Sequence, residues 1–236
     1  MVAGPVFQHK PGACARCGHP IEDLNSTHVC KACGRPQPAP ERALAPDYFA
    51  FFGIKRRLGL NLADLDKRFY EVSWTLHPDR FTTAAPEDRL ASVERMTFLN
   101  EGYRTLKDPF ARRRYFLELA GISRSGRAVP SALAELWFEV QESMSEHAET
   151  AAARFASFEE LFANTCRDHA RDVEALEREI DSALEKAEAA RLTHSGDVLP
   201  LTELLRQLSE WIQVETYLRS LARDVQRLKA EGPQCR

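Results

Sequence analysis

The sequence lacks any apolar run long enough to cross a membrane and carries almost no excess of charge of either sign. A membrane-spanning helix needs about 20 consecutive apolar residues. The 236-residue chain has 32 basic and 35 acidic residues, for a formal net charge of −3, so no general basic field favours nucleic acid or anionic lipid as a partner. Residues 1–20 resemble neither a secretion signal nor a mitochondrial presequence. We therefore expect a globular, cytoplasmic protein without a membrane or nucleic-acid partner.

Motifs that carry common enzyme chemistry are absent as well. The sequence shows no nucleophile paired with a base, no glycine-rich phosphate loop and no metal site with an open coordination position. We expect a protein that is not itself an enzyme and that acts on one.

Cysteine is scarce outside one short segment. Two of the six cysteines are isolated: Cys166, which we expect as a small buried hydrophobe on a helix, and Cys235, in a polar tail. The others form two C-x2-C pairs separated by twelve residues, and Gly18 and Gly34 each follow one pair. Such glycines permit the positive φ that closes a tight turn around a metal ion. The spacing predicts a closed, structural metal site with four thiolate ligands, Cys14, Cys17, Cys30 and Cys33.

Three alternatives concern this cluster: disulfides, a different metal ion and histidine ligands. Two disulfides would need an oxidising compartment, for which the sequence has no signal. Zinc is the expected ion, although iron fits the same four thiolates. His19 and His28 lie near the cluster, but four cysteines complete the coordination shell, so we expect both histidines to be solvent-facing loop residues. We also expect loss of the ion to loosen only the residues before the linker that follows.

The remaining chain divides by composition. Residues 37–46 end a stretch rich in proline and alanine and predict a linker. It separates a metal-binding segment, residues 1–36, from a helical module, residues 47–121. A C-terminal helical bundle then spans residues 122–236. The fold class expected is all-α with a small zinc-ribbon-like segment.

The sequence of the helical module, residues 47–121, predicts an antiparallel hairpin of two amphipathic helices. A short aromatic helix runs from a cap at Asp47 to Gly53. The first long helix begins at Asn61, and the second has Pro86 in its first turn and ends at Asp108. Apolar residues recur every three or four positions on both helices. The two stripes are Leu62, Leu65, Phe69, Val72 and Leu76, then Met96, Leu99, Tyr103 and Leu106.

The hairpin turns on the residues LHPDRF, 76–81. Pro78 disfavours helical backbone at His77 and removes a hydrogen-bond donor, so the helix must end there. Asp79 is then held outward on a stiff turn, close to basic residues of the preceding helix. Such a surface of both signs suits an arginine and nearby acids on another protein. The alternatives are a chance tripeptide at an ordinary turn and, for Lys67 and Arg68, a solvated helix face.

At these residues the chain resembles a known family. The segments DYFAFFG, RFYEVSWTLHPDRF, LASVERMTFLNEGYRTLKDP and RRRYFLELAG resemble the J-domain of the HscB family of iron–sulfur co-chaperones. The resemblance covers residues 47–121 closely, and the length and order of the later helices agree. It implies a protein that stimulates ATP hydrolysis by an HscA/DnaK-type chaperone and delivers the iron–sulfur scaffold protein to it. The implied chaperone-binding residues are His77, Pro78, Asp79, Lys67, Arg68 and Arg80.

The C-terminal part predicts an antiparallel three-helix bundle with helices near residues 131–148, 152–191 and 199–230. The first, SALAELWFEVQESM, has a broader apolar surface than one buried stripe requires. The resemblance implies that it docks the scaffold protein. Alternatively, Trp137 and Phe138 fill the bundle core. The implied scaffold-binding residues are Leu133, Leu136, Trp137, Phe138, Glu139 and Glu142.

Two other functions compete with the co-chaperone interpretation. One is a metal ribbon that binds nucleic acid while the helices dimerise, but the ribbon offers only Arg16, Lys31 and Arg35 as cations and no aromatic residue between its cysteines. The other is a purely structural helical protein. A homodimer also stays open as an assembly state.

Overall fold

The computed structural model describes residues 12–39, 47–122, 148–193 and 201–231, together with six residues between 131 and 141. The chain divides into two compact units, Met1–Gly121 with Leu184–Gly196, and Ile122–Ala183 with Asp197–Arg236. Among the described residues, no helix has the length and apolar character that a membrane crossing requires.

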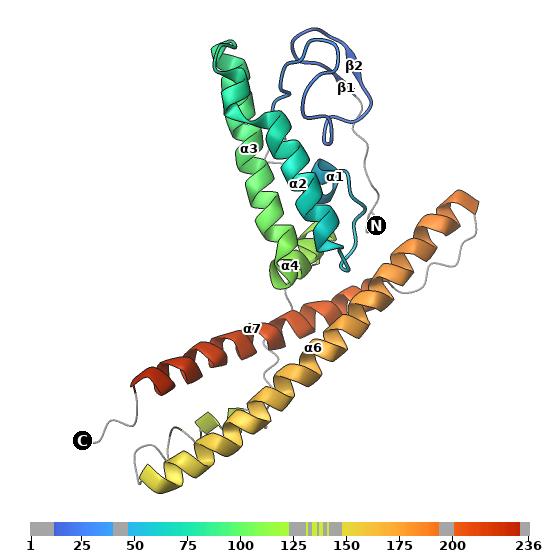
Figure 1. Cartoon of the computed structure of the whole chain (residues 1–236). Helices are drawn as coiled ribbons and strands as arrows, with labels where there is room; N and C mark the ends of the chain where they lie inside the picture. Colours follow the sequence, from blue (N-terminus) through green and yellow to red (C-terminus); the bar gives the residue numbers. More distant parts are fainter. Residues whose placement is uncertain are drawn as a thin grey trace. The chain divides into compact units, whose positions relative to one another are not determined.

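The tetracysteine segment, residues 12–37, is built from two small hairpins (Figure 1). Strands β1 (Gly12–Ala13) and β2 (Pro20–Ile21) pair antiparallel, and an isolated bridge joins Val29 to Pro36. Gly18 and Gly34 adopt φ of 71° and 69°, as the sequence predicts for the turn that follows each cysteine pair. Each hairpin therefore brings one pair of cysteines to its tip.

Helix α1 (Tyr48–Phe52) is the short aromatic helix expected from the sequence. The Asp47 side chain accepts a hydrogen bond from the Ala50 N–H, and Gly53 ends the helix at φ 62°. Both caps follow from local chemistry, since a short carboxylate satisfies a free N–H and glycine adopts the left-handed region without strain. Three phenylalanines of this segment are fully buried.

The predicted hairpin is present, and α1 packs against it. It comprises α2 (Leu62–Leu76), the 3₁₀ helix η1 (Pro78–Phe81) and α3 (Pro86–Lys107), and α4 (Pro109–Leu119) follows. Leu62 is an error of the sequence analysis: it is 41% exposed rather than part of the buried stripe. Leu62 is the first residue of α2, so no preceding helical turn covers its side chain.

A close approach between α1 and α3 fixes the core of this unit. A Cβ atom at Gly102 would lie 2.8 Å from Cδ1 of Tyr48 and 3.1 Å from the Phe52 ring. The Tyr48 ring in turn packs on Phe98 and on Tyr115, whose hydroxyl accepts a hydrogen bond from the Tyr48 N–H at 2.7 Å. The glycine therefore serves packing, although it weakens the helix itself.

The second unit contains two long antiparallel helices, α6 (Ala148–Thr193), whose last turns belong to the first unit, and α7 (Leu201–Glu231). Phe158 packs against Leu218, Leu221 and Val225, and the His169 ring stacks on Trp211 at 5.4 Å. His169 is thus a packed histidine. Cys166 packs against the same cluster but is only half-buried, and Cys235 lies outside the described residues.

Candidate functional site

The HPD turn lies between α2 and α3. Helix α2 ends at Leu76, and its cap residue His77 adopts φ −55° and ψ 128°, outside the helical region, because the next residue is proline. Pro78 then occupies the first turn of η1. His77 Nδ1 accepts a hydrogen bond from the Asp79 N–H at 3.3 Å, and Thr82 Oγ1 donates one to the Asp79 carbonyl at 3.3 Å. These contacts fix the backbone of the turn.

The carboxylate of Asp79 faces solvent. Its side chain is 84% exposed, and the nearer oxygen lies 3.5 Å from His77 Nδ1. Phe81, two residues later, is buried and anchors the turn to the core. The structure therefore presents a charged group on a backbone that hydrogen bonds and a buried ring hold in place.

The three basic residues assigned to chaperone binding are exposed: Lys67 and Arg68 on α2, and Arg80 on η1. Lys67 and Arg68 also line a cleft of about 530 Å³ next to α2. The guanidinium of Arg80 lies 5.9 Å from the centre of the Trp74 ring.

Two exposed aromatic residues of α2 are absent from the predicted site. Trp74 and Tyr70 are 74% and 70% exposed. The signal was available, because both residues lie off the apolar stripe of α2, and large apolar side chains in such positions face solvent.

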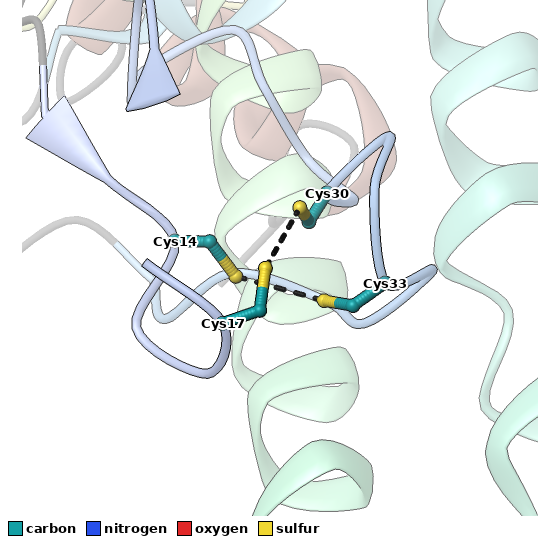
Figure 2. A group of neighbouring side chains, drawn as sticks. All are labelled: Cys14, Cys17, Cys30 and Cys33. Atoms are coloured by element: carbon teal, nitrogen blue, oxygen red, sulfur yellow. Dashed lines mark hydrogen bonds between the residues drawn. The ribbon is translucent and has the colours of Figure 1, made fainter. Parts of the chain in front are cut away.

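The four cysteines form a site that fits a tetrahedral metal ion. Their sulfur atoms lie within 4.8 Å of one another, and they point toward a common centre (Figure 2). The Sγ atoms of Cys14 and Cys33 are 3.7 Å apart, and those of Cys17 and Cys30 are 3.8 Å apart. Zinc–thiolate bonds of about 2.3 Å in tetrahedral geometry require sulfur separations of about 3.8 Å. The cysteines are free thiols rather than disulfides, so the residues fit a four-thiolate metal site such as zinc prefers.

The surroundings of the sulfurs shift the pKa values of two cysteines in opposite directions. Burial opposes ionisation of Cys14, but hydrogen bonds from the main-chain N–H groups of Arg16 and Cys17 and from the Gln37 side chain lower its pKa to about 6. The Arg16 N–H and Gln37 Nε2 each lie 3.4 Å from Cys14 Sγ. A main-chain hydrogen bond near Arg35 favours ionisation of Cys33, but burial and the neighbouring thiols raise its pKa to about 12. A divalent cation at the centre offsets the repulsion between neighbouring thiolates.

An acidic side chain at the start of α3 connects the tetracysteine segment to the hairpin. Asp88, only 2% exposed, accepts hydrogen bonds from Arg16 Nε at 3.2 Å and from Arg35 Nη1. Arg16 Nη2 also contacts Glu87 at 3.3 Å. Because Arg16 lies between the first two cysteines and Arg35 follows the last, one carboxylate contacts both cysteine hairpins.

A buried arginine of α3 makes the second connection. Arg95 has no exposed surface, and its guanidinium lies over the Phe51 ring. Nη1 donates to the Thr27 carbonyl at 2.7 Å, and Nη2 donates to the Leu24 carbonyl at 2.9 Å. Longer bonds reach the carbonyls of Asn25 and His28. Burial lowers the pKa of Arg95 to about 10, so the group stays charged at neutral pH.

His28 differs from its expected position. Its ring centre lies 4.6 Å from that of Phe51, whereas the sequence analysis expected a solvent-facing loop residue. Burial, with the charge of Arg95 as a smaller cause, lowers the pKa of His28 to about 3. His28 is therefore a neutral packing residue of the contact with α1, whereas His19 is exposed as expected.

Two residues of the predicted scaffold-binding helix have opposite environments. Trp137 is half-buried, and its ring centre lies 5.0 Å from that of Phe158. Phe138 is 72% exposed. The alternative of core filling therefore applies to Trp137 and not to Phe138. The other four residues of this group, Leu133, Leu136, Glu139 and Glu142, lie outside the described residues.

Comparison with known proteins gives consistent relatives, although no family model matches the chain. A curated protein of Aromatoleum aromaticum, described as a co-chaperone protein HscB homolog, is 34% identical over 151 residues, which are 63% of this chain and 85% of that protein. A homolog of the same description from Bordetella avium is 33% identical over 120 residues, 50% of this chain and 71% of that protein. The crystal structure of human co-chaperone protein HscB shares the fold, with a TM-score of 0.63 over 92% of this chain and 98% of that chain at 21% identity.

Proposed function

Because this chain belongs to the HscB family of co-chaperones, we propose that it stimulates ATP hydrolysis by an HscA/DnaK-type chaperone and delivers an iron–sulfur scaffold protein to it. The first activity is assigned to the HPD turn and the second to the helix that carries Phe138. The chain itself performs no catalysis in this scheme.

The observation that carries the proposal is the 84% exposed carboxylate of Asp79 on a fixed turn. A carboxylate in that position can accept two parallel hydrogen bonds from an arginine of the chaperone. The turn is ordered before binding, so little conformational entropy is lost when the complex forms. His77 and Pro78 act by shaping the turn, since one caps it and the other ends the helix.

The exposed cations of α2 and η1 are assigned to the encounter with the chaperone. Arg80 adjoins Asp79, whereas Lys67 and Arg68 lie further along α2 and share a cleft with Asp64 and Glu71; such cations attract acidic groups of a partner. Exposed charges of this kind change the association rate and its salt dependence more than the lifetime of the complex.

The scaffold protein binds the second unit through Phe138. A large aromatic ring that is mostly exposed has the character of an interface anchor. Trp137 instead contacts Phe158 and holds the helix on α6. Leu133, Leu136, Glu139 and Glu142 are assigned to the same surface from their positions in the sequence.

The tetracysteine site holds a structural ion, which we assign as zinc, through Cys14, Cys17, Cys30 and Cys33. Four thiolates leave no open position for a substrate or a reactive water. Metal analysis of the purified protein distinguishes zinc from iron. Nucleic-acid binding by this segment is not favoured, because Arg16 and Arg35, two of its three cations, bind Asp88.

The test is a reconstitution with purified components. The full chain is titrated into an HscA-type chaperone, and ATP hydrolysis is measured in single turnover with and without the scaffold protein. We expect saturable stimulation by the chain alone and a further increase when the scaffold is present. If saturating concentrations of the chain do not stimulate ATP hydrolysis, the co-chaperone activity is contradicted. If the chain stimulates hydrolysis but the scaffold protein adds nothing to the rate, only the delivery of the scaffold is contradicted.

A further inference from the structure

We propose that the tetracysteine segment is a metal-dependent clamp on the J-domain hairpin, α2–η1–α3, and that metal binding and hairpin stability are coupled through Asp88 and Arg95. The inference concerns the role of the segment and is independent of the partner proteins assigned above. It replaces the expectation that loss of the ion loosens only the residues before the linker.

The first contact makes the clamp sensitive to metal. Arg16 and Arg35 belong to different cysteine hairpins, and both bind the carboxylate of Asp88. The metal ion joins the same two hairpins, through Cys14 and Cys17 on one side and the other pair on the opposite side. Without the ion, the contacts between the two hairpins include the small apolar cluster of Cys14, Ile21 and Cys30 and the hydrogen bond from Gln37 to Cys14. These contacts restrain the spacing that lets both arginines reach one buried carboxylate less firmly than four metal–thiolate bonds do.

The second contact makes the hairpin sensitive to the clamp. Arg95 is fully buried, and its guanidinium donates to four main-chain carbonyls of residues 24–28. Asp23 orders this loop, since its carboxylate accepts hydrogen bonds from the Asn25 N–H and the Ser26 hydroxyl. A buried guanidinium that loses its acceptors is strongly unfavourable. When the loop opens, Arg95 must move into water and the α3 surface beneath the loop is exposed.

The clamp lies at the end of the hairpin that carries the HPD turn. Asp88 belongs to the first turn of α3, which begins five residues after η1. In the same region, the buried Ser92 hydroxyl donates to the Leu76 carbonyl at 2.7 Å and so joins α3 to the last residue of α2. Loosening the start of α3 therefore loosens the support of the turn.

Thermodynamic linkage makes the coupling testable from both sides. If the metal stabilises the hairpin by a given factor, then weakening the contact with the hairpin must lower metal affinity by a comparable factor. A metal segment that is merely tethered would show neither effect.

The experiment uses the full reduced chain with Zn²⁺ as the probe. Amide hydrogen exchange is compared between zinc-loaded and chelator-treated protein, and zinc affinity is measured by competition with a chromophoric chelator. We expect zinc removal to accelerate exchange at least tenfold in residues 86–99, while α7 stays unchanged. We expect Arg95→Met to weaken zinc binding at least tenfold and Asp88→Asn to weaken it several-fold.

The control variant is Arg89→Met, which removes an exposed arginine one position from Asp88 and should leave zinc affinity unchanged. Asp88→Asn and the exchange measurement on the unmodified chain keep the test valid if Arg95→Met does not fold. Exchange in residues 86–99 that changes less than twofold on zinc removal overturns the proposal. Wild-type zinc affinity in Asp88→Asn and in folded Arg95→Met also overturns it. None of these measurements involves ATP hydrolysis or scaffold binding.

Discussion

Replacing Asp79 by asparagine tests whether the carboxylate contacts the chaperone without changing the stability of the fold. The substitution keeps the shape of the side chain and removes its charge. The Asp79 side chain is 84% exposed, and its carboxylate lies 3.5 Å from His77 Nδ1, which also accepts a hydrogen bond from the Asp79 N–H. Because an exposed ion pair contributes little to stability, the free energy of unfolding should change by less than about 0.5 kcal/mol. The turn itself should therefore keep its conformation.

The effect on the chaperone should be much larger. Removing one partner of a buried, hydrogen-bonded charge pair in a complex costs about 2–5 kcal/mol, and 2 kcal/mol corresponds to about a 30-fold loss of affinity. We therefore expect the concentration of Asp79→Asn needed for half-maximal ATPase stimulation to rise at least about 30-fold. Single-turnover ATP hydrolysis, titrated over a wide range of co-chaperone concentration, measures it.

The matched control is Glu94→Gln, which neutralises an exposed acid on α3 and should stimulate like the natural chain. The melting temperatures of both variants should lie within about a degree of that of the natural chain. If Asp79→Asn stimulates normally, the carboxylate is not the contact that the geometry indicates. A large fall in its melting temperature would instead show that Asp79 supports the fold.

Three further substitutions test other parts of the structure. Phe138→Ala should weaken scaffold binding about tenfold or more in calorimetric titration without changing ATPase stimulation by the chain alone, as expected for an exposed interface anchor; unchanged affinity would remove Phe138 from the interface. Gly102→Ala should lower the free energy of unfolding by about 1–3 kcal/mol, because the added methyl overlaps the Tyr48 ring; a higher denaturant midpoint would contradict this packing. Ser92→Ala leaves the buried Leu76 carbonyl without its donor and should cost about 1–3 kcal/mol, measured by the same denaturation, and no loss would mean that the bond is replaceable.

Local signals in the sequence predicted the helices of the first unit closely. Asp47 and Gly53 bound α1, Asn61 caps α2, and Pro86 lies in the first turn of α3 as expected. Each boundary depends on the chemistry of a few adjacent residues, so it can be identified without knowledge of the fold. The cysteine spacing belongs to the same class, because each pair closes its own turn.

Contacts between distant residues were not predictable in this way. Arg95 and Thr27 are 68 positions apart, and Asp88 and Arg16 are 72 apart. Both α3 residues lie on the inward side of the helix, and a charged residue there was a usable signal of a buried polar contact. Its partner could not be named, since the acceptors of Arg95 are main-chain carbonyls, which every residue has.

By itself, the sequence determined the helix boundaries, the cysteine quartet and a proline-ended helix that turns Asp79 outward, because short-range sterics and hydrogen bonding govern each of them. Only the tertiary structure decided that the metal segment packs on α3, that His28 is covered by Phe51, and that Trp137 packs inward while Phe138 faces solvent. Those outcomes depend on which surfaces meet when the elements pack together. Desolvation and complementary hydrogen bonds settle that choice at long range, and they leave little trace in residue spacing.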